Sequence, residues 1–191
     1  MKWLWILGAT IVTVMVLLLL VINKPKPMVC TKQGQSKSFS ALDYKELESW
    51  QQQLIDKAEA VMSNSYNPYS KFAVGAAVLT SDGEIIVGTN FENASYGTTI
   101  CAERAAIIRA NSEGKRKIKA IAIIGRGKDF ETTEPVAPCG SCRQVIYEAS
   151  QIANNDVMVI MSNSKKDKII VSWISELLPL AFGPKDLGIV L

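Results

Sequence analysis

The chain has 191 residues, of which 48% are hydrophobic and 20% are charged. This length suits about one domain with an appendage. The basic excess lies at the front, because residues 1–40 hold five lysines and no acidic residue, whereas the remainder has a net charge of −2. Nucleic-acid binding requires clustered lysines and arginines, so this balance argues against a nucleic-acid substrate.

An uncharged apolar run of 20 residues, Trp3–Ile22, stands near the start of the chain. At about 1.5 Å per residue it spans about 30 Å, the thickness of a bilayer's hydrocarbon core. We therefore expect one transmembrane helix over residues 3–22. A cleaved signal peptide is the alternative, but the run is longer than a signal core, and no small-x-small cleavage site follows it.

The next segment, residues 23–42, is rich in lysine, serine, glutamine and proline. This composition predicts a flexible basic linker rather than an ordered element. Its lysines outnumber the charges before the apolar run, so the positive-inside rule predicts a single-pass membrane protein whose folded domain, residues 43–191, lies in the cytosol.

The remaining chain predicts helices that alternate with strands. A hydroxyl followed by an acid three positions on, within residues 40–43, predicts a helix start, and the helix should end near residues 64–68. A hairpin should follow, with strands at 72–79 and 84–89. The later elements are expected to be a helix at 101–111, a strand at 119–125, a helix from 139, strands at 157–161 and 169–172, and a short helix at 173–178. This order predicts an α/β sandwich around a mixed sheet.

The main chemical signal comes from Cys101, Cys139 and Cys142. Thiolates are strong zinc ligands, and a catalytic zinc uses three protein ligands. Cys139 and Cys142 stand three positions apart at an expected helix start, so their side chains face the same way. Both cysteine motifs open predicted helices, where the free N–H groups favour thiolates. The chain has no histidine, so zinc here would be held by cysteines and at most one carboxylate.

Taken alone, these cysteines leave three other interpretations open. They are compatible with small buried hydrophobic residues, with a redox pair at Cys139 and Cys142, and with a disulfide in an oxidising compartment. Glu103 and Pro138 narrow the choice. They complete C-x-E followed by P-C-x-x-C, which is the all-cysteine form of the known zinc deaminase signature.

Residues 50–187 resemble the small, all-cysteine, homotetrameric cytidine deaminases. Besides the two cysteine motifs, the resemblance rests on Tyr69–Ala77 (YSKFAVGAA), Asn90–Gly97 (NFENASYG) and Leu177–Pro184 (LLPLAFGP). It implies a three-layer α/β/α sandwich around a five-stranded mixed sheet, with one Zn²⁺ per subunit. It also implies hydrolytic deamination of cytidine and deoxycytidine to the uridines in pyrimidine salvage. Residues 1–40 depart from the family, which as a rule lacks a membrane anchor.

The resemblance also implies a role for each motif residue. Cys101, Cys139 and Cys142 would hold the zinc, Glu103 would move protons, and Arg104 would donate hydrogen bonds to sulfur. The remaining residues would bind substrate: Asn90 and Glu92 at the ribose 3′-hydroxyl, Phe72 and the backbone of Ala102 at the base, and Tyr96 and Phe182 at a contact between subunits. Each side chain alone has a plainer interpretation, such as a helix-start acid for Glu103 or a core ring for Phe72.

Two rival functions follow from the same motifs. A polynucleotide-editing deaminase requires a basic groove with stacking aromatic side chains, which the charge balance does not favour. A non-catalytic, membrane-tethered zinc or redox module leaves Glu103, Asn90 and Glu92 unexplained. A nucleoside is therefore the expected partner, with no nucleic acid.

Overall fold

The structure is a computed structural model that describes residues 39–191. The predicted transmembrane helix at residues 3–22 lies outside the described residues, as does most of the predicted linker. Among residues 39–191, no helix is both long enough and apolar enough to cross a bilayer.

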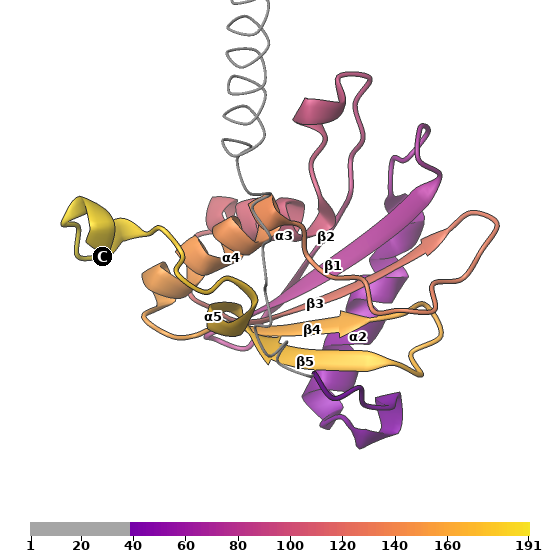
Figure 1. The fold of residues 1–191 in the computed structure, drawn as a ribbon, viewed down its shortest axis with the longest axis horizontal. Coiled ribbons are helices and arrows are strands. Elements are labelled where there is room, and N and C mark those ends of the chain that lie inside the picture. Colours follow the sequence, from indigo (N-terminus) through magenta and orange to yellow (C-terminus); the bar gives the residue numbers. More distant parts are fainter. Residues whose placement is uncertain (1–38) are drawn as a thin grey trace, which may run out of the picture. The chain divides into compact units, whose positions relative to one another are not determined.

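Five strands form one mixed sheet in the order β2-β1-β3-β4-β5 (Figure 1). Strands β3 and β4 pair in parallel, and the other neighbours pair antiparallel. The bounds are β1 at Phe72–Thr80, β2 at Ile85–Thr89, β3 at Ile118–Gly127, β4 at Met158–Ser162 and β5 at Ile169–Trp173. The mixed five-stranded sheet that the sequence predicts is confirmed.

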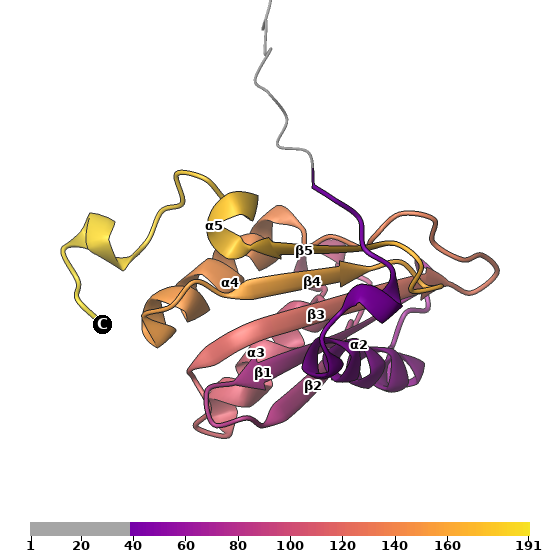
Figure 2. The same cartoon turned by 90° about the horizontal axis from the view of Figure 1, so that it is seen from below.

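Helices cover both faces of the sheet, which gives three layers (Figures 1 and 2). Helix α2 lies on one face, α3 and α4 lie on the other, and α5 follows β5. Their bounds are Ser49–Val61 for α2, Ala102–Ser112 for α3, Gly140–Ala153 for α4 and Ile174–Leu177 for α5. Except at the two ends of the first helix, the bounds that the sequence predicts lie within two residues of those observed.

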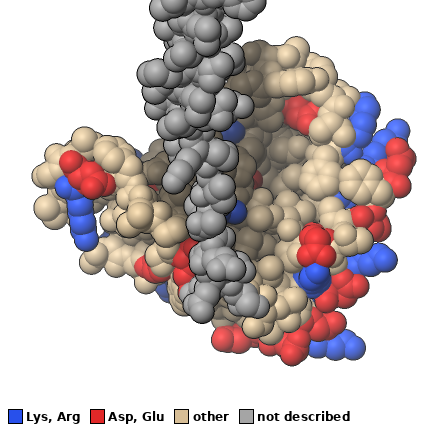
Figure 3. Space-filling view, viewed as in Figure 1, with Lys and Arg blue, Asp and Glu red and all other residues tan. Residues whose placement is uncertain are grey.

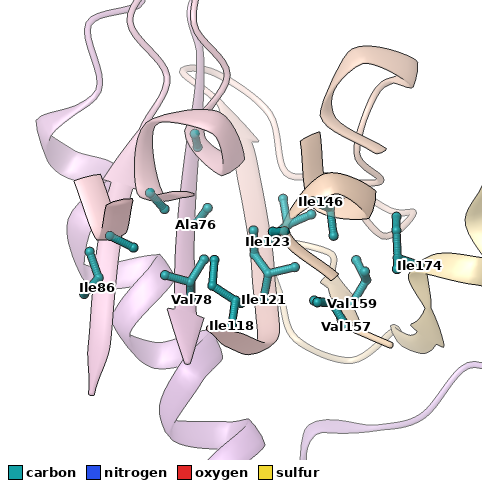
Figure 4. Packing of buried hydrophobic residues seen from close by; sticks show 14 of the residues in the cluster. Ala76, Val78, Ile86, Ile118, Ile121, Ile123, Ile146, Val157, Val159 and Ile174 are labelled. Carbon is teal, nitrogen blue, oxygen red and sulfur yellow. The ribbon is translucent and has the colours of Figure 1, made fainter. Parts of the chain in front are cut away.

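Two hydrophobic cores hold the layers together, one on each face of the sheet. Side chains alternate between the faces along β1, so Ala76 and Val78 join the core beneath α3 and α4, whereas Ala77 joins the core beneath α2. Figure 4 shows the first core, in which isoleucines and valines of the sheet pack against the helices. Because α3 and α4 pack on the same face, their starts lie on one side of the sheet.

The predicted helix start at residues 40–43 is wrong. Asp43 and Glu46 do form a capping box, but it caps the 3₁₀ turn Tyr44–Glu46. Leu42 cannot enter a helix because its backbone exchanges hydrogen bonds of 2.7 and 2.9 Å with Ile169 of β5. The helix itself begins at Ser49, after a second capping box that pairs Glu48 with Gln51. The helix ends at Val61, a little before the predicted end near residues 64–68, and a 3₁₀ turn at Met62–Asn64 continues the chain to the start of that range.

Candidate active site

Several strand ends meet at one edge of the sheet. Phe72, at the start of β1, pairs with Gly127 at the end of β3. Thr89, at the end of β2, pairs with Gly75 of β1, and Ser162, at the end of β4, pairs with Ile124 of β3. The chain leaves β2 for α3 and leaves β3 for α4 from this edge, so the two cysteine motifs are brought to the same place.

The three cysteines meet at the starts of α3 and α4. Cys101 is the N-cap of α3, Cys139 is the N-cap of α4, and Cys142 lies in the first turn of α4. All three sulfur atoms lie within 4.8 Å of one another, and the Sγ atoms of Cys139 and Cys142 are 3.5 Å apart. A tetrahedral zinc with Zn–S bonds of about 2.3 Å separates its sulfurs by about 3.8 Å. The cluster therefore fits one zinc ion.

The pKa values of Cys101 and Cys142 are shifted in opposite directions. A hydrogen bond from Cys142 and the nearby Arg104 lower the pKa of Cys101 to about 5. The pKa of Cys142 is raised, because its thiol is hydrogen-bonded to Cys101 and is buried beside Glu103. Three thiolates this close repel one another unless a positive ion lies between them. The donor set thus matches a zinc ion held by cysteines.

Arg104 lies against the cluster. Its Nη2 atom is 3.7 Å from the sulfur of Cys101 and donates a hydrogen bond of 2.6 Å to the carbonyl of Thr99. Its Nε atom is buried and has no hydrogen-bond partner among the described residues. The guanidinium places a fixed positive charge beside the thiolates and offsets part of their negative charge.

Glu103 is buried beside the sulfurs, with 4% of its surface exposed. Burial is the largest cause that raises the pKa of its carboxyl group, and the charge of Cys101 raises it further. Residues two apart on a helix do not normally face each other. Here Cys101 has the extended backbone of an N-cap (φ −72°, ψ 155°), so it turns back toward the first helical turn, and Glu103 can share the site.

Asn90 and Glu92 form a second polar group on the segment that follows β2. Asn90 is buried; its amide donates a 2.9 Å hydrogen bond to the carbonyl of Phe72 and accepts one of 2.9 Å from the backbone of Val74. One of its two amide N–H groups is thereby used, and the second suits a hydroxyl of a ligand.

Glu92 is also buried and is held by the segment before β1. One of its oxygens, Oε2, accepts hydrogen bonds of 2.9 and 3.2 Å from the backbone of Tyr69 and Ser70. Burial raises the pKa of this carboxyl group, but the hydrogen bonds from Ser70 and Tyr69 outweigh it, so the net shift is downward. Glu92 is therefore an ionised acceptor whose position is fixed.

The aromatic residues of the predicted site are more exposed than its polar residues. Phe72 is half-buried at the start of β1. Tyr96 is 72% exposed and packs edge-on against Tyr69 at 5.8 Å between ring centroids. Phe182 is 61% exposed on the segment after α5, where its carbonyl accepts a 2.8 Å hydrogen bond from Gln144. Ala102, the first residue of α3, is buried directly after Cys101.

The sequence interpretation missed three residues that position this site. Ser65 donates a hydrogen bond to the amide oxygen of Asn90, and Ser70 accepts one from the backbone of Phe72. Arg143 ties down the loop before α4 through bonds of 3.0 Å to Pro138 and 2.9 Å to Leu177. Arg143 lies directly after the second cysteine motif and Ser70 lies within the motif Tyr69–Ala77, which were the available signals, whereas Ser65 stands in a stretch that reads only as a turn.

Comparison with known proteins agrees with this geometry. The family model described as the cytidine and deoxycytidylate deaminase zinc-binding region matches residues 48–160. A cytidine deaminase of Halalkalibacterium halodurans is 46% identical over 137 residues, which is 72% of this chain and 97% of that protein. A cytidine deaminase of Sporosarcina psychrophila is 43% identical and covers 72% of this chain and 94% of its own length.

A solved structure shares the fold as well as the sequence. The crystal structure of a cytidine deaminase from Burkholderia pseudomallei superposes with a TM-score of 0.61 at 43% identity. The match covers 68% of this chain and 97% of that one. A family model that spans more than half of the chain, together with relatives matched over nearly their whole length, leads to one conclusion: this chain belongs to the cytidine deaminase family.

Proposed function

We propose that this chain is a zinc-dependent hydrolase that converts cytidine and deoxycytidine to uridine and deoxyuridine in pyrimidine salvage, with one Zn²⁺ per subunit. The observation that carries the proposal is the cluster of three sulfurs within 4.8 Å of one another, with the buried Glu103 beside it. This arrangement combines a zinc ligand set with a proton carrier, as hydrolytic deamination requires.

Each residue then has a defined task. Zinc bound to the three thiolates would supply the acidity that makes water a nucleophile at neutral pH. Glu103 would accept one proton from the water that forms the new bond to C4 and pass it to ring N3. It would then take the remaining proton from the C4 hydroxyl, as that oxygen becomes the carbonyl, and give it to the amino group as the C4–N bond breaks and ammonia leaves. Arg104 keeps its positive charge beside the sulfur of Cys101, which limits the negative charge of the site.

Substrate choice follows from the polar group at Asn90 and Glu92. An amide N–H and a carboxylate oxygen suit the 3′-hydroxyl of a ribose, and Phe72 and the backbone of Ala102 suit the base. The negative charge of Glu92 repels phosphate, which favours nucleosides over nucleotides. On the face in Figure 3, basic and acidic side chains are interspersed along the rim, a pattern that supports a nucleoside over a polynucleotide substrate.

The exposed rings support a homotetramer as the working form. Tyr96 and Phe182 are 72% and 61% exposed, and large exposed apolar side chains commonly mark contacts between proteins. In the proposed assembly, Phe182 would enter the site of a neighbouring copy, and Tyr96 would belong to the same contact. Size-exclusion chromatography with light scattering tests this assembly.

The proposed location is a membrane, with residues 3–22 as a single anchor and the catalytic domain in the cytosol. The sequence supports this location, because an uncharged run of 20 residues is followed by a lysine-rich segment. Such a segment favours the cytosolic side of a membrane. A glycosylation pattern at Asn93–Ser95 also favours the cytosol, because a glycan beside Glu92 would crowd the proposed sugar site. Protease protection in membrane vesicles of known sidedness tests the orientation, and a catalytic domain shielded in the lumen contradicts it.

One experiment tests the proposed activity. Ammonia release from cytidine and deoxycytidine is measured on the purified chain, and the zinc content of the same sample is determined. We expect both nucleosides to be deaminated and about one zinc per chain. Full activity in zinc-free protein contradicts the proposal, as does a zinc-loaded chain that releases no ammonia from either nucleoside.

A further inference from the structure

We propose that Phe130 is a positioning residue that holds the ring of Phe72 in place and so shapes the base side of the substrate site. This inference rests on the proposed deaminase function, in which Phe72 contacts the base. Phe130 lies on the segment between β3 and α4, which Figure 1 shows as the long loop that leaves the end of β3. Its ring centroid is 6.1 Å from that of Phe72, and the ring planes are inclined by 34°.

Two glycines of β3 make room for these rings. A Cβ atom on Gly127 would lie 2.1 Å from Cε1 of Phe130, and a Cβ atom on Gly125 would lie 3.0 Å from Cε1 of Phe72. Residues two apart on a strand share a face, so the rings lie next to each other on the same face of the sheet. This is the face of α3 and α4, because Val74, two residues after Phe72, packs in their core.

The backbone also fixes Phe130 relative to Phe72. The backbone N–H of Gly127 donates a 3.1 Å hydrogen bond to the carbonyl of Phe130, which closes a tight turn at the end of β3. The N–H of Lys128, inside that turn, donates a 2.8 Å bond to the carbonyl of Lys71. Since Lys71 immediately precedes Phe72, the two aromatic residues stand on backbone segments that are directly joined.

The far side of the turn is tied to the sheet as well. Thr132 and Ser164 exchange hydrogen bonds of 2.9 and 2.8 Å between backbone and side chain, and the hydroxyl of Thr132 donates a 3.1 Å bond to the carbonyl of Gly125. Lys168 forms an ion pair with Glu134. The turn that carries Phe130 therefore has a fixed point on each side.

Stability of the fold does not account for this construction. Phe130 is 60% exposed, so its ring buries little surface and adds little to the hydrophobic core. Its defined contact is with the ring that the proposed function places against the base. A ring packed behind Phe72 limits the rotation of that side chain and keeps the base wall preformed before substrate arrives.

Steady-state kinetics of the full chain with cytidine test this role. We expect Phe130→Ala to raise KM about threefold to tenfold, the range of one aromatic pair, with kcat and Tm nearly unchanged, because Phe72 would contact the base equally in the ground state and the transition state. Phe130→Tyr keeps the ring and should restore the wild-type KM. The matched control is Phe39→Ala, another exposed phenylalanine, which should leave KM unchanged.

Phe72→Ala and the double variant make the test specific to the pair. If Phe130 acts through Phe72, adding Phe130→Ala to a chain that already carries Phe72→Ala should raise KM by less than twofold. An unchanged KM in Phe130→Ala, a rise that is fully additive with Phe72→Ala, or a parallel fall of kcat and Tm overturns the inference while the deaminase function stands. A wild-type chain that releases no ammonia from cytidine overturns the proposed function, and the inference with it.

Discussion

The zinc-binding half and the rim of the site are built in different ways. Cys142 and Glu103 are buried at helix starts, where one chain supplies the backbone caps, the neighbouring guanidinium and the surrounding core. Tyr96 and Phe182, which the proposed function assigns to a contact between subunits and which we call the rim, are mostly exposed and lie on segments outside the sheet and the α-helices.

In the proposed assembly, this difference separates what one chain can preorganise from what a neighbouring copy would supply. A thiol cluster and a buried carboxyl group need fixed geometry before substrate arrives, and the packed starts of α3 and α4 provide it. An exposed ring has no such support within its own chain. We therefore expect substitutions in the buried half to act on chemistry and metal binding, and substitutions at the rim to act on substrate affinity and assembly.

The largest effect is expected for Glu103→Gln. The amide keeps the size of the side chain but cannot carry the proton, so kcat for cytidine should fall about 10²–10⁴-fold while zinc content stays unchanged. Steady-state kinetics and metal analysis on the same sample measure both quantities. Glu113→Gln, at the exposed end of the same helix, is the control and should retain wild-type activity. If Glu103→Gln retained a rate near wild type, Glu103 would not be the proton carrier and would act only as an acidic residue at the start of a helix.

Cys142→Ser should mainly affect metal binding. Cys142 is buried among the three sulfurs, and a hydroxyl is a much poorer zinc ligand than a thiolate. Removing an outer partner of a metal ligand already costs about 10–100-fold in affinity, so loss of a ligand should cost more than about 100-fold. Zinc titration against a competing chelator measures the change, with the adjacent Ser141→Ala as control. Unaltered zinc affinity in Cys142→Ser would remove this residue from the ligand set.

The buried half was largely predictable from the sequence. The spacing of the two cysteine motifs, with a helix expected after each, already indicated that Cys101 and Cys139 open helices and that Glu103 stands in a first turn. These are local properties, because a cap and the residues after it are set by near neighbours in the chain.

What the sequence did not predict depends on contacts between distant segments. Leu42 pairs with Ile169 in β5, and this pairing overrides a local helix signal at residues 40–43. The hydrogen bond from Ser65 to Asn90 joins residues 25 positions apart. The ring of Phe130, on the loop after β3, contacts the ring of Phe72 at the start of the neighbouring strand β1. No periodicity or spacing within one segment records such contacts, because they depend on the register of the sheet.

A smaller effect is expected for Glu92→Gln, which changes a residue of the proposed sugar site. Glutamine keeps one acceptor oxygen for the backbone of Tyr69 and Ser70, so the loop should remain folded. The loss of charge weakens the acceptor offered to the 3′-hydroxyl by about 1 kcal/mol. The preference for cytidine over 3′-deoxycytidine should therefore shrink about fivefold. The ratio of kcat/KM values measures it, with Glu84→Gln as the exposed control; an unchanged ratio would separate Glu92 from the sugar.

Phe182→Ala should have a modest effect on each site. The ring is 61% exposed within its own chain, so its removal should leave Tm within about 2 °C of wild type. Loss of one aromatic contact should lower kcat/KM for cytidine about threefold to tenfold. The matched control is Leu187→Ala, a similarly exposed apolar residue of the same C-terminal region, which should retain activity. Equal losses in both variants would indicate a general defect of this region rather than a role for the ring.

Mixing two variants decides whether Phe182 acts on its own site or on a neighbour's. A Phe182→Ala chain keeps Glu103, and a Glu103→Gln chain keeps the ring, so each supplies what the other lacks. If the ring enters the site of another copy, co-refolded mixtures should show a higher kcat/KM per intact Glu103 than Phe182→Ala alone, because wild-type rings then reach sites that retain the proton carrier. If the ring serves its own chain, mixing leaves the kinetics of Phe182→Ala unchanged. Phe182 would then act on the site of the chain that carries it.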